Sequence, residues 1–275
     1  MHRFKYDHPL DDGVRRRVME ELAALERRHH VRVLYACESG SRAWGFASPD
    51  SDYDVRFLYV HRPQWYLQVE PQRDVIELPL DDELDISGWE LRKALQLLNR
   101  SNPTMFEWLQ SPLVYRADEK AAAALRELMA DFHSLGRCRW HYLSMARKNH
   151  RVHLQGETVR LKKYLYVLRP LLAVRWLDAG KGLPPMRFAD LAAATVEDDG
   201  LAAEINHLLA IKMAAGEAQL GGRLPKLDAF IASMLAEPVP PLPGRHDGDV
   251  RRLDRLLQEW VMGSVREDGP AACAI

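Results

Sequence analysis

A Gly-Ser pair and two nearby aspartates form the part of this 275-residue chain best suited to chemistry. Gly40 and Ser41 are followed, after ten intervening residues, by Asp52 and Asp54 in the segment CESGSRAWGFASPDSDYDVRFLYV. Side chains alternate along a strand, so an extended backbone places both carboxylates on one side and Tyr53 on the other. Two such carboxylates can hold Mg²⁺ (or Mn²⁺) together with substrate phosphates, to which a Gly-Ser turn offers backbone N–H groups and a hydroxyl. The spacing predicts nucleotidyl transfer.

Each half of this motif is common by itself. A lone Gly-Ser is usually a turn, and two aspartates one residue apart often end a loop. Here an apolar run at 31–35 leads into the turn and another at 55–60 follows the acids, which indicates strand, turn, loop and strand. Carboxylates at the start of a buried strand are costly unless a cation compensates them. We therefore predict that Asp52 and Asp54 are catalytic residues and metal ligands.

A third carboxylate is needed from a neighbouring strand. Asp85 lies between two apolar residues in a short strand-like run, and Glu77 occupies a similar position in the run before it. We predict Asp85 as the general base or shared metal ligand, with Glu77 as the alternative. Three further acids between the two runs are expected to form a solvated turn: Asp81, Asp82 and Glu83.

The motif GSRAWG followed by SDYDVRF resembles the signature of the DNA polymerase beta-like nucleotidyltransferase superfamily. Within it, the chain is most similar to the RNA repair pathway or YcgL-type group of predicted nucleotidyltransferases. Three more segments carry that resemblance, over about residues 30 to 190: DISGWELRKALQLLNRSNPTMFEWLQSPLVY, YLSMARKNH and KKYLYVLRPLLAVRW. The resemblance implies RNA ends as the acceptor.

Positive charge for a triphosphate is expected from the helical half of the chain. Lys162, Tyr166 and Arg169 fall on one face of a helix expected at 157–179, and Lys163 adjoins them. Lysine acts on phosphate as a point charge and arginine can clamp it, although a solvated basic face is the alternative for the two lysines. Arg42 is a further candidate, because its loop should approach the triphosphate.

Other residues around the motif are expected to be structural. Trp44 should pack under the loop rather than stack on a base, and Glu38 and Ser39 should be turn residues. The three cysteines have no metal-site or disulfide spacing and are expected to be reduced: Cys37, Cys138 and Cys273.

The patterns favour an α+β fold, with a small mixed β-sheet nucleotidyltransferase core and flanking helices, followed by a helical C-terminal domain. We expect helices at 11–29 and 89–100 and strands near 31–37, 53–60, 74–78 and 84–88. From residue 118 the pattern is almost wholly helical, without clear strands. The expected division is therefore 1–117 for the catalytic domain and 118–275 for a helical domain that closes the nucleotide cleft.

Composition narrows the class of protein. The net charge of −1 and pI near 6.8 argue against a generally basic nucleic-acid coat. The chain has no apolar run long enough to span a membrane and no apolar signal core, so a cytoplasmic protein with no membrane partner is expected.

The predicted reaction is transfer of a nucleoside monophosphate from an NTP to a hydroxyl, with pyrophosphate leaving. An RNA acceptor is favoured. AMP transfer to a protein hydroxyl and a catalytically inactive nucleotide-binding module are the alternatives, and the base, the acceptor and the oligomeric state stay open.

Overall fold

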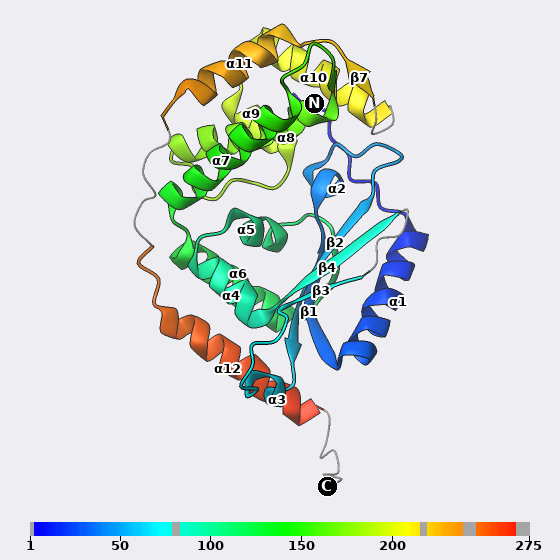
Figure 1. The fold of residues 1–275 in the computed structure, drawn as a ribbon, viewed down its shortest axis with the longest axis vertical. Coiled ribbons are helices and arrows are strands. Elements are labelled where there is room, and N and C mark those ends of the chain that lie inside the picture. The colour runs from blue at the N-terminus through cyan, green and yellow to red at the C-terminus, as the bar shows by residue number, and fades with distance from the viewer. Residues whose placement is uncertain (1–2, 79–82, 215–218, 239–245, 268–275) are drawn as a thin grey trace.

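A mixed five-stranded sheet forms the centre of the molecule (Figure 1). The structure is a computed structural model that describes residues 3–78, 83–214, 219–238 and 246–267. The strand order is β3-β4-β2-β1-β5, with β2 and β4 parallel and the other neighbours antiparallel. The predicted small mixed sheet is thereby confirmed. The strands are β1 (Val31–Glu38), β2 (Tyr53–His61), β3 (Val75–Glu77), β4 (Leu84–Glu90) and β5 (Val114–Ala117).

Helices cover both faces of this sheet. Helix α1 (Asp12–His29) begins where the Asp11 carboxylate accepts backbone N–H groups, and it packs its apolar stripe against strand residues that include Val55 and Phe57. Three helices pack on the opposite face of the sheet and are visible beside it in Figure 1. These are α4 (Leu91–Asn99), α5 (Pro103–Leu109) and α6 (Glu119–Phe132).

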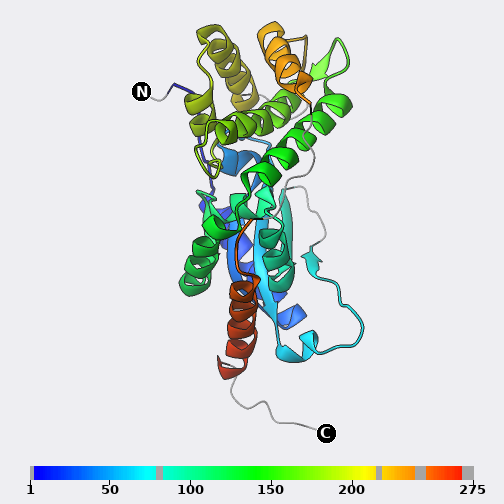
Figure 2. The same ribbon diagram turned by 90° about the vertical axis from the view of Figure 1, so that its left-hand side faces the viewer.

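The remaining helices gather at the end of the sheet where the short helix α2 (Gly40–Trp44) lies, as Figures 1 and 2 both show. They are α7 (Leu135–His153), α8 (Lys162–Asp178), α9 (Phe188–Thr195), α10 (Asp199–Ala214) and α11 (Pro225–Ala236). By contrast, α12 (Val250–Glu267) returns to pack on α4, β2 and the short helix α3 (Pro63–Tyr66). One apolar cluster runs from the sheet into these helices, across the predicted boundary at residue 117.

Two local expectations were wrong. The helix expected from residue 157 begins only at Lys162, because β6 (Val159–Arg160) precedes it and pairs with β7 (Leu220–Gly221). The segment after residue 118 therefore does contain strands, formed by a pairing between distant parts of the chain. Glu38 is not a turn residue, because β1 extends through it and buries it completely.

Some expectations fall on residues that the structure does not describe. Asp81, Asp82 and Cys273 lie outside the described residues. Cys37 and Cys138 are buried free thiols. Across the described ranges, none of the helices is both long and apolar enough to cross a membrane.

Candidate active site

Asp54 and Asp85 stand opposite each other on neighbouring parallel strands. The register of β2 and β4 pairs the two residues directly. Tyr53 and Val55 belong to the apolar layer under α1, so alternation turns Asp54 to the opposite side of the sheet, as predicted. Both carboxylates stay partly open to solvent, with exposed side-chain fractions of 29% for Asp54 and 36% for Asp85. The two acids lie at the end of the sheet nearest to α2.

An arginine bridges the two acids. Arg56 follows Asp54 on the same side of β2, and its Nη2 lies 2.7 Å from Asp54 Oδ1 and 2.7 Å from Asp85 Oδ2. Its Nη1 donates to the backbone carbonyl oxygens of Asp85 at 2.8 Å and Val55 at 3.1 Å. Arg56 was not predicted from the sequence, because an arginine in a strand is also typical of an exposed sheet position.

The Gly-Ser turn packs directly against Asp54. Gly40 has a φ of +57°, which disfavours any residue with a Cβ, and a Cβ built there would lie 1.8 Å from Asp54 Oδ2. The backbone N–H of Ser39 donates to the Asp54 carbonyl at 2.8 Å. The two halves of the motif, ten residues apart in sequence, therefore form one contact.

Glu38 supports Asp54 from below. Its Oε1 accepts the Asp54 backbone N–H at 2.8 Å, and its Oε2 accepts the Tyr115 hydroxyl from β5. Burial raises the pKa of Glu38 to about 7, while these hydrogen bonds oppose the rise. Ser111 donates to the Glu38 carbonyl at 2.6 Å, which also holds the end of β1 in place.

Asp52 lies at the end of a loop that two buried cations anchor. Asp52 is exposed, one residue before β2 begins. The Arg42 guanidinium donates to the carbonyl oxygens of Ser51 at 2.6 Å and Asp52 at 3.3 Å, and it lies 3.7 Å from the centre of the Tyr53 ring. From α10, Lys212 Nζ donates to the Ser51 hydroxyl at 3.0 Å.

These contacts make Arg42 a loop anchor, with only 4% of its surface exposed. A contact between Arg42 and a triphosphate stays a prediction. Lys212 was missed altogether, because a lysine near the end of a helix is ordinarily a solvated residue.

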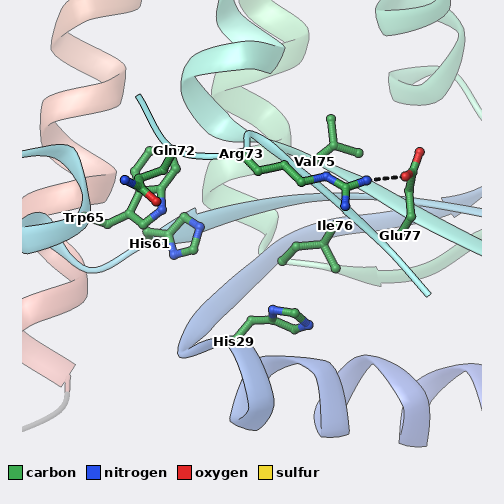
Figure 3. A pocket seen from close by; sticks show the side chains of 8 residues that line it. All are labelled: His29, His61, Trp65, Gln72, Arg73, Val75, Ile76 and Glu77. Carbon is green, nitrogen blue, oxygen red and sulfur yellow. Dashed lines mark hydrogen bonds and ion pairs between the residues drawn. The ribbon is translucent and has the colours of Figure 1, made fainter. Parts of the chain in front are cut away.

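Glu77, the alternative third acid, lies one strand farther from Asp54. It is on the edge strand β3, opposite Ser87 rather than opposite Asp54. Figure 3 shows its side chain directed toward Arg73, with which it forms an ion pair at the rim of a hollow of about 220 Å³. His61, which stacks on Trp65 with ring centres 4.3 Å apart, lines the same hollow. Position therefore favours Asp85 as the partner of Asp54.

Side-chain contacts of three predicted residues on α8 connect this helix to α2. Lys163 Nζ lies 4.9 Å from the centre of the Tyr166 ring, and that ring meets Trp44 edge-on with centres 5.6 Å apart. The guanidinium carbon of Arg169 lies over the Trp44 ring, 4.7 Å from its centre. Trp44 is partly buried against the apolar core and connects α8 with α2, the helix that begins at Gly40.

Arg169 also belongs to a buried network. Its Nη1 donates to Glu107 Oε1 at 2.8 Å, and the Tyr142 hydroxyl donates to the same oxygen at 2.8 Å. Because this pair is almost completely enclosed, removing either partner would leave an uncompensated buried charge. Lys162 stands in the first turn of α8, half-buried like Lys163.

The carboxylates of the site fit a hard divalent cation whose coordination sphere is completed by a substrate. Among the residues that the structure describes, no three His, Cys, Asp or Glu side chains converge to enclose a metal by themselves. Mg²⁺ is usually held by one or two carboxylates, with waters and phosphate oxygens completing its octahedron. The Arg56 guanidinium already places a cation between Asp54 and Asp85.

Known proteins resemble this chain to different degrees. The chain is 43% identical over 259 residues to the uncharacterized protein YcgL of Bacillus subtilis (strain 168), covering 93% of this chain and 99% of that protein. A crystal structure of a nucleotidyltransferase-like protein from Exiguobacterium sibiricum matches 92% of this chain and 81% of its own. The TM-score between the two chains is 0.31 and their sequence identity is 12%. Residues 14–259 match the RNA repair pathway DNA polymerase beta family, and the chain belongs to that family.

Proposed function

We propose that this protein transfers a nucleoside monophosphate from an NTP to a hydroxyl group at an RNA end, with release of pyrophosphate. The observation that carries the proposal is the contact of Gly40 with Asp54, which itself stands opposite Asp85 on a parallel strand. A phosphate-binding turn and an acid pair are thus parts of one site. The RNA acceptor rests on the family's description alone.

In this proposal Asp54 would share Mg²⁺ or Mn²⁺ with Asp52 and with Asp85, and Asp85 is also the general base. When bound, the cation supplies charge stabilisation for the entering and leaving oxygens. Gly40 and Ser41 orient the phosphates through backbone N–H groups and the Ser41 hydroxyl. Lys162 and Lys163 add positive charge beside the β- and γ-phosphates, with Tyr166 beneath Lys163.

Asp85 takes the proton. The acceptor hydroxyl oxygen forms a bond to the α-phosphorus as the bond to pyrophosphate breaks, and the hydroxyl proton passes to the Asp85 carboxylate. Arg42 and Arg169 contribute through position, because Arg42 anchors the loop before Asp52 and Arg169 supports Trp44.

A label-transfer experiment tests the proposal. The protein is incubated with Mg²⁺ or Mn²⁺, each of the four NTPs labelled at the α-phosphate, and RNA oligomers with free hydroxyl ends. The expected result is label on the RNA, lost in Asp52→Asn and Asp54→Asn. Asp254→Asn, which alters an exposed carboxylate on α12, is the matched control and should transfer normally.

The location of the label separates the alternatives. Label on the protein itself, with none on RNA, would replace RNA by a protein hydroxyl as acceptor. NTP binding without pyrophosphate release would contradict nucleotidyl transfer and leave a nucleotide-binding module.

A further inference from the structure

Arg56 occupies the position between Asp54 and Asp85 where a cation would be attracted. Each of its two terminal nitrogens carries two N–H groups. Those of Nη2 reach one carboxylate on each strand, both at 2.7 Å, the length of a charge-assisted hydrogen bond. Those of Nη1 reach the backbone carbonyls of Val55 and Asp85. The guanidinium is thus fixed by both strands, with 16% of the side chain exposed.

The strand register determines this placement. Arg56 pairs with Ser87 on β4, so its long side chain faces a small neighbour. It reaches the Asp54–Asp85 pair, two residues earlier on the same side of the sheet. Without a compensating charge, two carboxylates on directly paired residues would repel each other.

We propose that Arg56 is a resident counter-cation that competes with the divalent ion for Asp54 and Asp85. In metal-free protein it neutralises part of the acid pair and holds the two carboxylates side by side. A divalent ion must displace Nη2 from at least one carboxylate and also meets the repulsion of the guanidinium. The protein alone then binds the metal weakly, and phosphate oxygens of the NTP are needed for tight binding. Metal binding is thereby coupled to NTP binding.

This inference rests on the proposed function for the identity of the ion. It predicts a change in metal affinity that a residue merely bracing the two strands would not produce. Removing a brace weakens or leaves unchanged the affinity for metal. Removing a competing positive charge increases it, even if the fold becomes less stable.

The test is a Mn²⁺ titration without nucleotide, with free Mn²⁺ followed by electron paramagnetic resonance. For Arg56→Gln, which keeps the first three side-chain carbons and a polar end but removes the charge, we expect a Kd for Mn²⁺ at least about tenfold lower than in wild type. Arg56→Lys keeps the charge but cannot bridge both strands, so its Kd should fall between the two. Arg73→Gln, an exposed arginine paired with Glu77, is the control and should match wild type.

Thermal unfolding supplies a second readout if Arg56→Gln folds poorly without metal. Its melting temperature should be lower than that of wild type in chelator, and saturating Mn²⁺ should raise it by more than it raises wild type. An Arg56→Gln protein that binds Mn²⁺ no better than wild type, or an Arg56→Lys protein that binds it worse, would overturn the proposal.

The two proposals fail separately. Equal Mn²⁺ affinities together with normal label transfer to RNA would remove only the role of Arg56. Tighter Mn²⁺ binding in Arg56→Gln, with no label transfer by wild type, would support the role of Arg56 and contradict the reaction.

Discussion

Replacing Gly40 by alanine tests whether the Gly-Ser turn and the acid pair form one site. The added Cβ would lie 1.8 Å from Asp54 Oδ2 and 2.8 Å from Asp54 Cγ. Restoring an ordinary contact requires the carboxylate or the turn to move by about 1.5 Å or more. That shift would pull Asp54 Oδ1 away from Arg56, to which it is bonded at 2.7 Å.

Two costs add up in this variant. The left-handed backbone at a φ of +57° costs an alanine about 1–2 kcal/mol. The close contact adds roughly 1–3 kcal/mol, the usual range for overpacking. A misplacement of about 1 Å at a reacting centre can lower the rate by about 100-fold, and we expect a loss of label transfer of that order.

Gly180→Ala separates the two costs. Gly180 also has a positive φ, +67°, but nothing lies within 4 Å of the Cβ that would be added. Denaturant unfolding should show about 1–2 kcal/mol of destabilisation for Gly180→Ala and about 1–3 kcal/mol more for Gly40→Ala, while only Gly40→Ala loses transfer. Equal stability and transfer rates within about threefold of each other would refute the direct contact between turn and acid.

Three further predictions concern the third acid, the lysines and the hollow of Figure 3. Asp85→Asn should keep NTP binding and lose about two orders of magnitude in turnover, whereas Glu77→Gln should stay active; the reverse result in single-turnover assays would move the base to β3. Replacing Lys162 and Lys163 together with alanine should raise the KM for NTP and lower kcat but leave AMP binding unchanged, and equal NTP binding in calorimetry would place both on a solvated face. Burial, with His29 nearby, lowers the pKa of His61 to about 4, so the unfolded chain binds a proton between pH 6.5 and 4 that the folded chain does not. Stability should therefore decline by roughly 1–2 kcal/mol as pH falls through that window, a figure reduced for partial exposure, and His61→Gln should decline less in urea unfolding.

Individual helices and strands could be predicted because their apolar residues recur at regular intervals in the sequence. Alternation around Asp54 identified β2 and its two faces, and the apolar stripe from Val14 to Leu25 identified α1. The end of β1 could not be predicted in the same way. Glu38 followed by Ser39 and Gly40 is typical of a turn, and only Ser111 and Tyr115, more than 70 residues later, show that Glu38 is a buried strand residue.

The candidate site residues were selected from the sequence by residue type. The side chains that they contact could not be predicted in that way. Asp85 was preferred over Glu77 for its apolar neighbours, but its place opposite Asp54 comes from the parallel pairing of β2 with β4. The same pairing brings Arg56 to both acids, a contact that depends on two registers at once. No spacing within the sequence could indicate it, since strand pairing across an intervening segment is a property of the folded sheet.

The contribution of the helical half also becomes visible only in three dimensions. Its lysines were selected for charge, yet the contacts that join α8 to the motif pass through aromatic rings, from Lys163 to Tyr166 to Trp44. Lys212 makes a second connection, from α10 to the loop that ends at Asp52. The helical half therefore holds both the Gly-Ser turn and the loop that ends at Asp52, while Asp54 and Asp85 are held by the pairing of β2 with β4. In the proposed reaction, the position of Asp52 relative to Asp54 then depends on how the helical half packs against the sheet.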